Sequence, residues 1–380
     1  MSVKADVDST AARLRGRLVR ALVRNGTLTD HAWRDAFLAV PRHAFLPRYF
    51  RQRLGRWEAV DTVDDDWLTQ IYADRVLVTQ LDGDSTRWAA ARAGGPVVGA
   101  PTCSSSMPTI MAVMLEALQV KDNHRILEVG TGTGYNAALL CVRQGDDLVS
   151  TIDIDESLAG PAEQHLADCG LRPTCAVADG VDGLPDGAPY DRVLCTCAVP
   201  RIPTAWLEQT RPGGVVVTTL SRPLGAGLVR ITAGDGPTGT GEVLADDGRF
   251  MPLRAPRTRS VVWPEPDAPG STRPTTLSAG VISPTSPFEF FAGLELPDVH
   301  AAGAANYALL THPDGSWARH ENDVVIQSGP RRLWDEMEVA YDRWQELGGP
   351  RRARFGITVD ADGQRLWLDE PTSRNRWPLP

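Results

Sequence analysis

The chain has 380 residues, of which 42% are hydrophobic and 23% charged, enough for a water-soluble core and long for one compact unit. Its formal net charge of −9 argues against a nucleic-acid partner, because phosphate binding needs a basic stripe that the sequence lacks. No apolar window is long enough to cross a bilayer and no secretory signal opens the chain, so we expect a cytoplasmic protein without a membrane partner.

Metal and disulfide chemistry are not expected. The six cysteines contain no CxxC pair, and the seven histidines show no metal-ligand spacing. Buried reduced thiols are therefore the favoured interpretation of the cysteines.

The first hundred residues predict two amphipathic helices and a long connection. Apolar residues at helical spacing indicate helices over 12–24 and 29–40, and Pro41 ends the second. Residues 82–99 are expected to form a loop or an insertion.

The pattern changes at Ser106, which we expect to cap a buried helix with Pro108 in its first turn. Apolar strands and helical segments then alternate from 126 to 220. Pro161 is expected to perturb one of these helices. Such alternation predicts an α/β fold with a parallel sheet.

After about residue 230 the sequence predicts another domain. Two hairpins are expected over 307–321 and 355–370, each turning at an Asp-Gly pair. Between them, 330–347 has the apolar spacing of a helix.

Three glycines at alternate positions, Gly130, Gly132 and Gly134, follow the apolar strand 126–129 and precede a helix. Glycine permits positive φ and a close approach of backbone to a ligand, so a nucleotide-like cofactor is indicated. The spacing is GxGxG, and Tyr135 stands where the dinucleotide fingerprint has its third glycine. That difference demotes NAD.

Acidic residues that follow the next strands favour S-adenosylmethionine (SAM). Asp153 ends the strand after the glycine loop, where an acid accepts ribose hydroxyls, and Asp155 is the reserve candidate. Asp179 follows the third strand and could take the amino group of an adenine, with Gly180 leaving room for the ring. Several acids without a phosphate-binding Lys or Arg suit a sulfonium cofactor that carries no phosphate.

Each of these features also has an ordinary structural explanation. The glycines could form a simple tight turn, Asp153 could cap a helix, and Asp179 could be a turn residue. Tyr135 could simply pack. Together and in this order, they favour the cofactor site.

At this point the chain resembles the protein L-isoaspartate O-methyltransferase family over about residues 12–222. The resemblance is carried by "LEVGTGTGYNAALL", "STIDID", "ADGVDGLPDGAPYDRVLCTCAVPRIP", "AVPRHAFLP" and "YADRVLVTQ". It implies a Rossmann-like class I SAM-dependent methyltransferase fold with an N-terminal helical and substrate region and an additional C-terminal α+β domain. The expected boundaries are 1–105, 106–230 and 231–380, the last being a peptide-recognition domain.

The resemblance also implies a set of site residues. The stretch "SSSMPTIMA" is similar to the family's Ser-Gln-Pro substrate motif, with Met107 in place of glutamine. Substrate binding is expected at Ser104, Ser105, Ser106 and Met107, and catalytic contacts at Ser105, Ser106 and Thr196. Cofactor binding is expected at Glu128, Gly130, Thr131, Gly132, Gly134, Tyr135, Asp153, Ile154, Asp179, Gly180 and Thr196.

The chemistry of ester formation explains why few side chains are needed. An aspartyl carboxylate is ionised near neutral pH, so no general base is required. Hydroxyl or N–H donors suit its oxygens, because a tightly paired cation would stabilise the ground state too much. Ser106 fits this role, although it could merely cap the helix, and Thr196 could as well satisfy the backbone.

Met107, the insertion near 82–98 and the C-terminal extension favour a particular substrate. They are similar to features of actinobacterial members that methylate aspartate in ribosomally made, crosslinked peptides such as lanthipeptides and graspetides. The leading hypothesis is such an aspartate O-methyltransferase, whose ester product forms a succinimide and then isoaspartate. The alternative is repair of isoaspartyl proteins, and a nicotinamide oxidoreductase or a non-catalytic binding module are less favoured.

Overall fold

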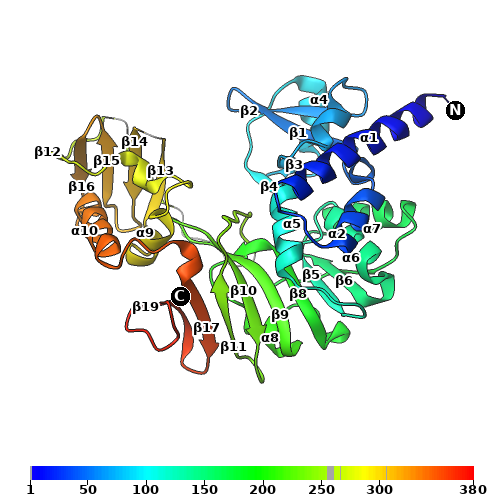
Figure 1. Cartoon of the computed structure of the whole chain (residues 1–380). Helices are drawn as coiled ribbons and strands as arrows, with labels where there is room; N and C mark the ends of the chain where they lie inside the picture. Colours follow the sequence, from blue (N-terminus) through cyan, green and yellow to red (C-terminus); the bar gives the residue numbers. More distant parts are fainter. Residues whose placement is uncertain (1, 255–260, 266, 305) are drawn as a thin grey trace. The chain divides into compact units, whose positions relative to one another are not determined.

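The computed structural model describes residues 2–254, 261–265, 267–304 and 306–380, drawn in sequence colours in Figure 1. The chain forms two compact units. Unit 1 comprises Met1–Cys197, Pro203–Val217 and Thr232–Pro237, and unit 2 comprises Ala198–Ile202, Thr218–Ile231 and Thr238–Pro380. Each unit is described in turn.

The first part of unit 1 consists of helices and a small antiparallel sheet of order β2-β1-β3-β4, and the sequence had not led us to expect this sheet. The helices are α1 (Ser2–Arg24), α2 (His31–Ala39), α3 (Trp67–Ile71) and α4 (Arg87–Gly94). The strands are β1 (Arg48–Arg53), β2 (Arg56–Asp61), β3 (Leu77–Leu81) and β4 (Pro101–Ser105). The predicted helix 12–24 is confirmed as part of α1, and the helix predicted over 29–40 is confirmed as α2, which Asp30 caps.

The prediction of a loop over 82–99 is wrong, because helix α4 occupies its middle. The alanine-rich run "RWAAARAG" has high helix propensity, and Trp88 and Ala91 pack it against the small sheet. The flanking Gly and Asp residues, which suggested a loop, lie in the turns at its two ends.

The rest of unit 1 is the predicted parallel sheet. Strand β5 pairs in parallel with β6 and β8, and β6 with β7, within the order β9-β8-β5-β6-β7. The strands are β5 (Ile126–Val129), β6 (Val149–Asp153), β7 (Thr174–Val177), β8 (Tyr190–Val199) and β9 (Thr210–Leu220). The helices are α5 (Pro108–Ala117), α6 (Tyr135–Gln144), α7 (Glu156–Asp168), which continues through Pro161, and α8 (Thr204–Glu208). Parallel strands place their carboxyl ends at one edge, where open α/β sheets bind ligands.

The described part of unit 2 contains two groups of strands and two α-helices. The first has the order β19-β18-β17-β11-β10: β10 (Gly227–Ala233), β11 (Gly239–Val243), β17 (Phe355–Asp360), β18 (Gly363–Leu368) and β19 (Arg376–Pro378). The second has the order β12-β16-β15-β14-β13: β12 (Ser271–Pro274), β13 (His300–Ala304), β14 (Tyr307–Thr311), β15 (Trp317–Glu321) and β16 (Val324–Ser328). The hairpins predicted over 307–321 and 355–370 are confirmed as β14/β15 and β17/β18.

Helices α9 (Glu289–Glu295) and α10 (Leu333–Glu346) pack on each other, and α10 also packs on β14, β15 and β16 (Figure 1). The predicted helix 330–347 is thus confirmed as α10. Rings of Phe288, Phe291, Phe355 and Trp377 contact one another or their neighbours in the core of this unit. Short 3-10 turns complete the chain: η1 (Arg42–Phe45), η2 (Asp146–Leu148), η3 (Pro185–Gly187), η4 (Ala279–Ile282) and η5 (Arg352–Arg354).

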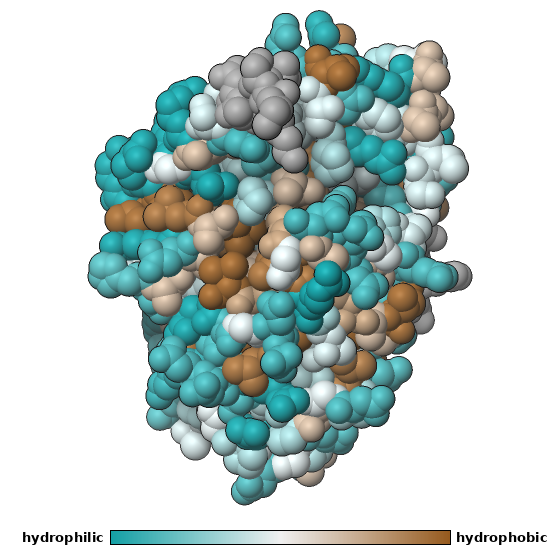
Figure 2. Space-filling view, turned by 90° about the vertical axis from the view of Figure 1, so that its right-hand side faces the viewer, coloured by the Kyte–Doolittle hydropathy of each residue, from teal (hydrophilic) through white to brown (hydrophobic). Residues whose placement is uncertain are grey.

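The face in Figure 2 is mainly hydrophilic, with hydrophobic side chains in small separate groups. Within the described part of the chain, no helix combines the length and the apolar character that a membrane span requires.

Candidate active site

The glycine loop between β5 and α6 has a backbone that only glycine adopts without strain. Gly130, Gly132 and Gly134 have φ angles of +99°, +53° and +85°. A Cβ atom on Gly130 would lie 2.7 Å from the Thr196 Oγ1 atom and 3.0 Å from the Cys197 Sγ atom. The loop therefore needs glycine for its conformation and for its close approach to β8.

Asp153, at the end of β6, holds this loop. Its Oδ2 atom accepts a hydrogen bond from the Gly132 backbone N at 2.9 Å, and its Oδ1 atom accepts one from the Asp155 backbone N at 3.0 Å. Each carboxylate oxygen has a further lone pair, so Asp153 can also accept a ribose hydroxyl. Its position at the carboxyl end of a parallel strand supports that role.

The two residues that follow Asp153, Ile154 and Asp155, have different roles. Asp155 caps helix α7 by accepting from the Ser157 backbone N at 3.0 Å and also bonds the Gln80 amide at 2.9 Å. Ile154 between the two acids is 42% exposed, which leaves its side chain available to cover a ring. Asp155 is thus already committed to a helix cap, which leaves Asp153 as the better ribose candidate.

Asp179 and Gly180 follow β7 in a turn. The Asp179 Oδ1 atom accepts from the Val181 backbone N at 3.0 Å, and the Gly180 carbonyl accepts from Trp206 Nε1 at 2.7 Å. Asp179 is half-buried, and its other carboxylate oxygen remains available for an adenine amino group. The turn explanation and the cofactor prediction are therefore compatible.

Glu128 lies behind the glycine loop rather than at its surface. It is fully buried and accepts hydrogen bonds of 2.6 Å from Asn136 Nδ2 and from Thr151 Oγ1. Burial raises the pKa of Glu128 to about 7, and these hydrogen bonds act in the opposite direction. This buried position indicates that Glu128, on β5, supports the glycine loop together with its partner on β6.

Three further predicted residues pack within the protein. Thr131 Oγ1 lies 2.7 Å from Thr151 Oγ1, and Thr196 Oγ1 donates to the Gly130 carbonyl at 2.8 Å. The Tyr135 ring is 5% exposed and lies edge-on to Phe37 and Phe45. These contacts fix the loop and the start of α6, which favours the packing interpretation of Tyr135.

The serine segment and the glycine loop meet in unit 1. A Cβ atom on Gly132 would lie 3.6 Å from the Cys103 Sγ atom and 4.0 Å from the Ser104 carbonyl oxygen. Ser105 ends strand β4 and is buried, whereas Ser104 and Ser106 are half-buried. Residues predicted for substrate and for cofactor are therefore neighbours.

Ser106 does not cap helix α5, so that prediction is wrong. The N-cap position belongs to Met107, which makes no side-chain capping bond, and Asp74 accepts instead from the Thr109 backbone N at 2.9 Å. Among the described residues, the Ser106 hydroxyl has no hydrogen-bond partner. A hydroxyl that the helix does not use is free to bind a substrate oxygen.

Arg42 is a residue that our sequence reasoning missed, although it lies in the quoted segment "AVPRHAFLP". Its guanidinium is 0% exposed and donates to the Ser106 carbonyl at 2.9 Å, to Ser105 Oγ at 3.2 Å and to the Ile71 carbonyl at 2.8 Å. Within the described ranges, no carboxylate lies within ion-pair distance of it. Burial lowers its pKa, and the Tyr135 ring 5.7 Å away contributes favourably to holding the cation.

A buried cation without a carboxylate partner is costly, so its retention behind the serine segment indicates a purpose. It orients Ser105 and Ser106 through its hydrogen bonds and places a positive charge beside the serine segment. Sequence alone gives a weak signal for this residue, since a single Arg after Pro41 could equally be a surface residue.

Other candidates are structural. His43 Nδ1 lies 2.8 Å from the Tyr72 hydroxyl, which is a structural hydrogen bond. Two tryptophans of unit 2 are also structural: Trp334 is fully buried and donates to Thr275, and Trp344 packs on Phe288. Core packing accounts for these two.

Comparisons with known proteins can be set beside this geometry. The family model described as protein-L-isoaspartate(D-aspartate) O-methyltransferase matches residues 95–239. A protein-L-isoaspartate O-methyltransferase of Caulobacter sp. is 34% identical over 255 residues, which cover 66% of this chain and 96% of that relative. This chain belongs to the protein-L-isoaspartate O-methyltransferase family.

Solved structures agree with the fold. A protein-L-isoaspartate O-methyltransferase with 19% identity covers 94% of this chain and 100% of its own, with a TM-score of 0.54. A Plasmodium falciparum chain described as a member of the family, in complex with S-adenosyl-L-homocysteine, has 14% identity, covers 63% of this chain and 97% of its own, and has a TM-score of 0.46.

The predicted Rossmann-like class I fold is thus confirmed, and the cofactor is SAM. The C-terminal extension does not by itself set this chain apart from isoaspartate methyltransferases, because a solved protein of that name aligns over 94% of the chain.

The residues present fit the family's cofactor. The three left-handed glycines bring backbone within reach of a ligand, and Asp153 and Asp179 each retain acceptor capacity at the sheet edge. SAM supplies a methyl group on a positively charged sulfur. The acids at this edge suit the ribose, the adenine and that charge, and none of the predicted cofactor residues is a phosphate-binding cation.

Proposed function

We propose that the chain is a SAM-dependent carboxyl O-methyltransferase that esterifies the free carboxylate of isoaspartyl residues in proteins and peptides. The observation that carries the proposal is the approach of the serine segment to the glycine loop, with Gly132 beside Cys103 and Ser104. A donor bound over the loop would face hydroxyl and backbone groups of residues 104–106. The family membership supports the same chemistry.

The chain's own residues supply position rather than acid or base. A carboxylate is ionised at neutral pH and needs only to be held in line with the methyl, with the reacting atoms about 3 to 3.5 Å apart. The Ser106 hydroxyl can donate to one carboxylate oxygen, while Arg42 fixes the backbone of the segment from behind. A carboxylate oxygen forms the new bond to carbon, the carbon–sulfur bond breaks, and the sulfonium becomes a neutral thioether.

Arg42 contributes charge without direct pairing. The N–H groups on Nη1 and Nη2 donate to backbone carbonyl oxygens and to Ser105 Oγ, and the Nε atom is buried without a partner, so the guanidinium cannot form a bidentate ion pair with the substrate. A tight pair would stabilise the carboxylate before reaction and raise the barrier. Because Arg42 lies behind the serine segment, its charge attracts the substrate carboxylate without pairing with it. The carboxylate therefore stays reactive.

The ester then reacts without further help. The backbone nitrogen of the following residue attacks the ester carbonyl, methanol leaves, and a succinimide forms. Water opens this ring to aspartate or isoaspartate. The enzyme needs to provide only the ester.

Paired peptides test the proposal. Two peptides of identical sequence, one with isoaspartate and one with aspartate, would be incubated with labelled SAM, and methyl ester would be measured as methanol released by base. We expect turnover of the isoaspartyl peptide and at most trace turnover of its isomer. Equal turnover of both, or of neither, would overturn the assignment.

A second candidate keeps the chemistry and changes the substrate to an aspartate in a ribosomally made, crosslinked peptide of the lanthipeptide or graspetide kind. The observation that favours it is Met107, which stands at the N-cap of α5 where the resembled substrate motif has glutamine. Methionine has no hydrogen-bond donor and only a weak acceptor, whereas glutamine could both donate to and accept from an isoaspartyl backbone. A lactam-crosslinked peptide containing one aspartate is the third arm of the assay, and turnover of that arm alone would select this candidate.

A further inference from the structure

Unit 2 contains a pocket of about 680 Å³ whose lining is unusual in composition. Seven of its fourteen lining residues are prolines, which are rigid and have no backbone N–H to donate. The side chains that can donate are those of Ser221, Arg222, His300 and His312. The volume is typical of ligand pockets, which are mostly apolar with a few convergent polar groups.

Arg222 is the cation of this pocket, and its charge is incompletely balanced. Among the described residues, its hydrogen-bond partner is the Gly293 carbonyl at 2.5 Å, and no carboxylate lies within ion-pair distance. Burial lowers its pKa to about 10, and Asp298 opposes this shift. The guanidinium therefore stays protonated at neutral pH, with most of its five N–H groups left for water or a ligand.

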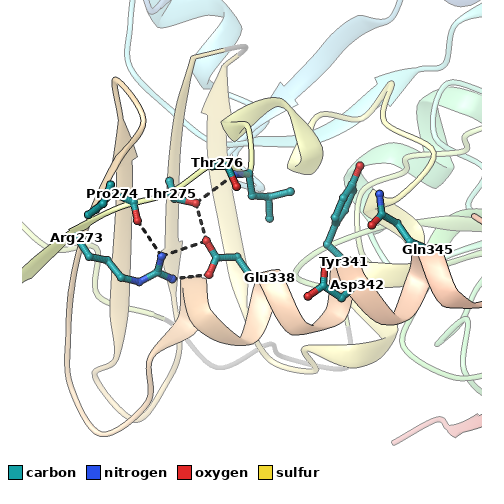
Figure 3. A pocket seen from close by; sticks show the side chains of 9 residues that line it. Arg273, Pro274, Thr275, Thr276, Glu338, Tyr341, Asp342 and Gln345 are labelled. Carbon is teal, nitrogen blue, oxygen red and sulfur yellow. Dashed lines mark hydrogen bonds and ion pairs between the residues drawn. The ribbon is translucent and has the colours of Figure 1, made fainter.

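A second pocket of unit 2 provides the contrast (Figure 3). There the Arg273 guanidinium forms ion pairs with the carboxylates of Glu338 and Asp335. Thr275 also donates a hydrogen bond to Glu338. These ion pairs link β12 to α10. They also balance the charge of Arg273, so this arginine does not attract an anion. Other arginines of unit 2 are paired in the same way, as Arg249 is with Glu289 and Arg343 with Glu295.

The remaining groups of the proline-lined pocket set limits on a ligand. Burial lowers the pKa of His300, so at neutral pH it offers a neutral imidazole. His312 Nδ1 lies 2.9 Å from the Asp314 carboxylate, which already balances any charge that it carries. Asp298 also lines the pocket and would repel a second anion, so one acidic group is the most that the site accepts.

We propose that this pocket binds one carboxylate of the peptide substrate, an acidic side chain or the C-terminal carboxylate, through Arg222. Along the chain, Pro200 and Ser221 come directly after β8 and β9, and the carboxyl ends of such strands are where open α/β sheets bind ligands. The inference rests on the proposed function, since it assigns part of the recognition of that same peptide to unit 2. The carboxylate bound here is distinct from the one that is methylated.

Four isoaspartyl peptides that differ only in a second carboxylate test the inference: one with an amidated C-terminus and no carboxylate other than that of the isoaspartyl residue (the neutral peptide), one with a single downstream glutamate, one with a free C-terminus, and one with both. KM and kcat would be measured for the wild type, Arg222→Gln and Arg222→Lys. The matched control is Asp342→Asn, a charge change in the pocket of Figure 3. The affinity for S-adenosylhomocysteine shows whether each variant keeps unit 1 intact.

For peptides that carry a second carboxylate, Arg222→Gln should raise KM about tenfold, in line with a hydrogen-bonded charge pair, and leave kcat unchanged. Arg222→Lys should recover part of the loss. The neutral peptide and Asp342→Asn should show no change, and whichever singly charged peptide responds identifies the source of the carboxylate. An equal effect on all four peptides, or no effect on any, would overturn the inference.

The two proposals can fail separately. If the wild type methylates none of the peptides, the proposed function fails, and binding of aspartyl peptides of the same four designs would be measured by calorimetry. A carboxylate-dependent affinity that Arg222→Gln removes would still uphold the pocket. Equal affinities for the neutral and the acidic peptides would refute it.

Discussion

The glycine loop of unit 1 and the Arg222 pocket of unit 2 differ in the chemical groups that they offer to a ligand. The loop offers backbone: glycines with left-handed φ angles and a Gly132 N–H held by Asp153. The pocket offers side chains on a proline-lined wall that has few backbone donors. The loop is one continuous run of five residues, 130–134, whereas the pocket collects residues from 200 to 380.

This difference separates two kinds of sensitivity. In the loop, a change of one residue alters the backbone that every substrate depends on, so all activity should fall together. In the pocket, a change removes one donor from one wall, so only peptides that use this donor should be affected. The following substitutions test whether changes that alter the loop backbone affect all substrates, whereas changes to single side chains have narrower effects.

The largest effect is expected from Gly130→Ala. Its Cβ atom would lie 2.7 Å from Thr196 Oγ1 in a left-handed backbone, and overpacking and conformational strain together cost on the order of 4 kcal/mol. Gly145→Ala is the matched control, because Gly145 has a φ of +90° and nothing within 4 Å of a Cβ. Calorimetry with S-adenosylhomocysteine should show binding lost in the first variant and kept in the second; loss in both would mean that strain alone decides.

Glu128→Gln should alter the pH dependence of stability. Because the pKa of Glu128 is raised from 4.5 to about 7 in the folded protein, its contribution is complete below pH 4.5 and is lost as pH rises to about 7. The loss corresponds to about 3 kcal/mol, so the variant should flatten the unfolding free energy over this window. Parallel curves for the two proteins, measured by urea unfolding from pH 4 to 8, would contradict the shift.

Arg42→Lys should lower kcat more than it weakens cofactor binding. Lysine keeps the charge but cannot reach the carbonyls of Ile71 and Ser106 and the Ser105 hydroxyl at once, which costs about 2 kcal/mol. The control is Arg53→Lys, because the Arg53 side chain is 72% exposed in a surface ion pair. A fall in melting temperature with an unchanged kcat would reduce Arg42 to a purely structural role.

Asp153→Asn should weaken S-adenosylhomocysteine about tenfold, or about 1.5 kcal/mol. The amide keeps one acceptor for Gly132 N but cannot accept at both of its polar atoms. Asp155→Asn is the control, since Asp155 caps α7 and should affect stability more than cofactor affinity. If the Asp155 variant lost more affinity, the two acids would exchange roles.

Much of unit 1 could be predicted from sequence because its signals are local. Hydrophobic runs, Asp-Gly turns and the glycine loop report on residues close together in the chain, and these predicted the parallel sheet and both hairpins of unit 2. The small sheet β2-β1-β3-β4 was missed because its strands are polar at alternate or irregular positions and α4 interrupts them. Periodicity alone could not find it.

The site residues divide in the same way. Gly130, Gly132 and Gly134 have the positive φ angles that glycine permits, and Asp153 bonds the Gly132 backbone N, while cofactor binding by these residues stays a prediction. Arg42 was missed because its partners, Ile71 and Ser105–Ser106, are distant in sequence, and nothing local marks an arginine as buried. The prediction that Ser106 caps α5 was wrong for a related reason. The residue that accepts from the start of this helix is Asp74, which is also distant in sequence.

The smallest effect, about 1 kcal/mol, is expected from Ser106→Ala, and it is also the most specific. Since the Ser106 hydroxyl bonds no described residue and Asp74 serves the start of α5, the substitution should leave stability unchanged. It removes one donor to a substrate oxygen, so kcat/KM for the isoaspartyl peptide should fall about fivefold to tenfold while S-adenosylhomocysteine binds normally. Thr109→Ala is the contrasting variant: Thr109 Oγ1 donates to Asp74, so stability should change there and kcat/KM should not. If Ser106→Ala lowered the melting temperature and spared catalysis, the serine would belong to the scaffold, and backbone groups alone would contact the substrate in unit 1.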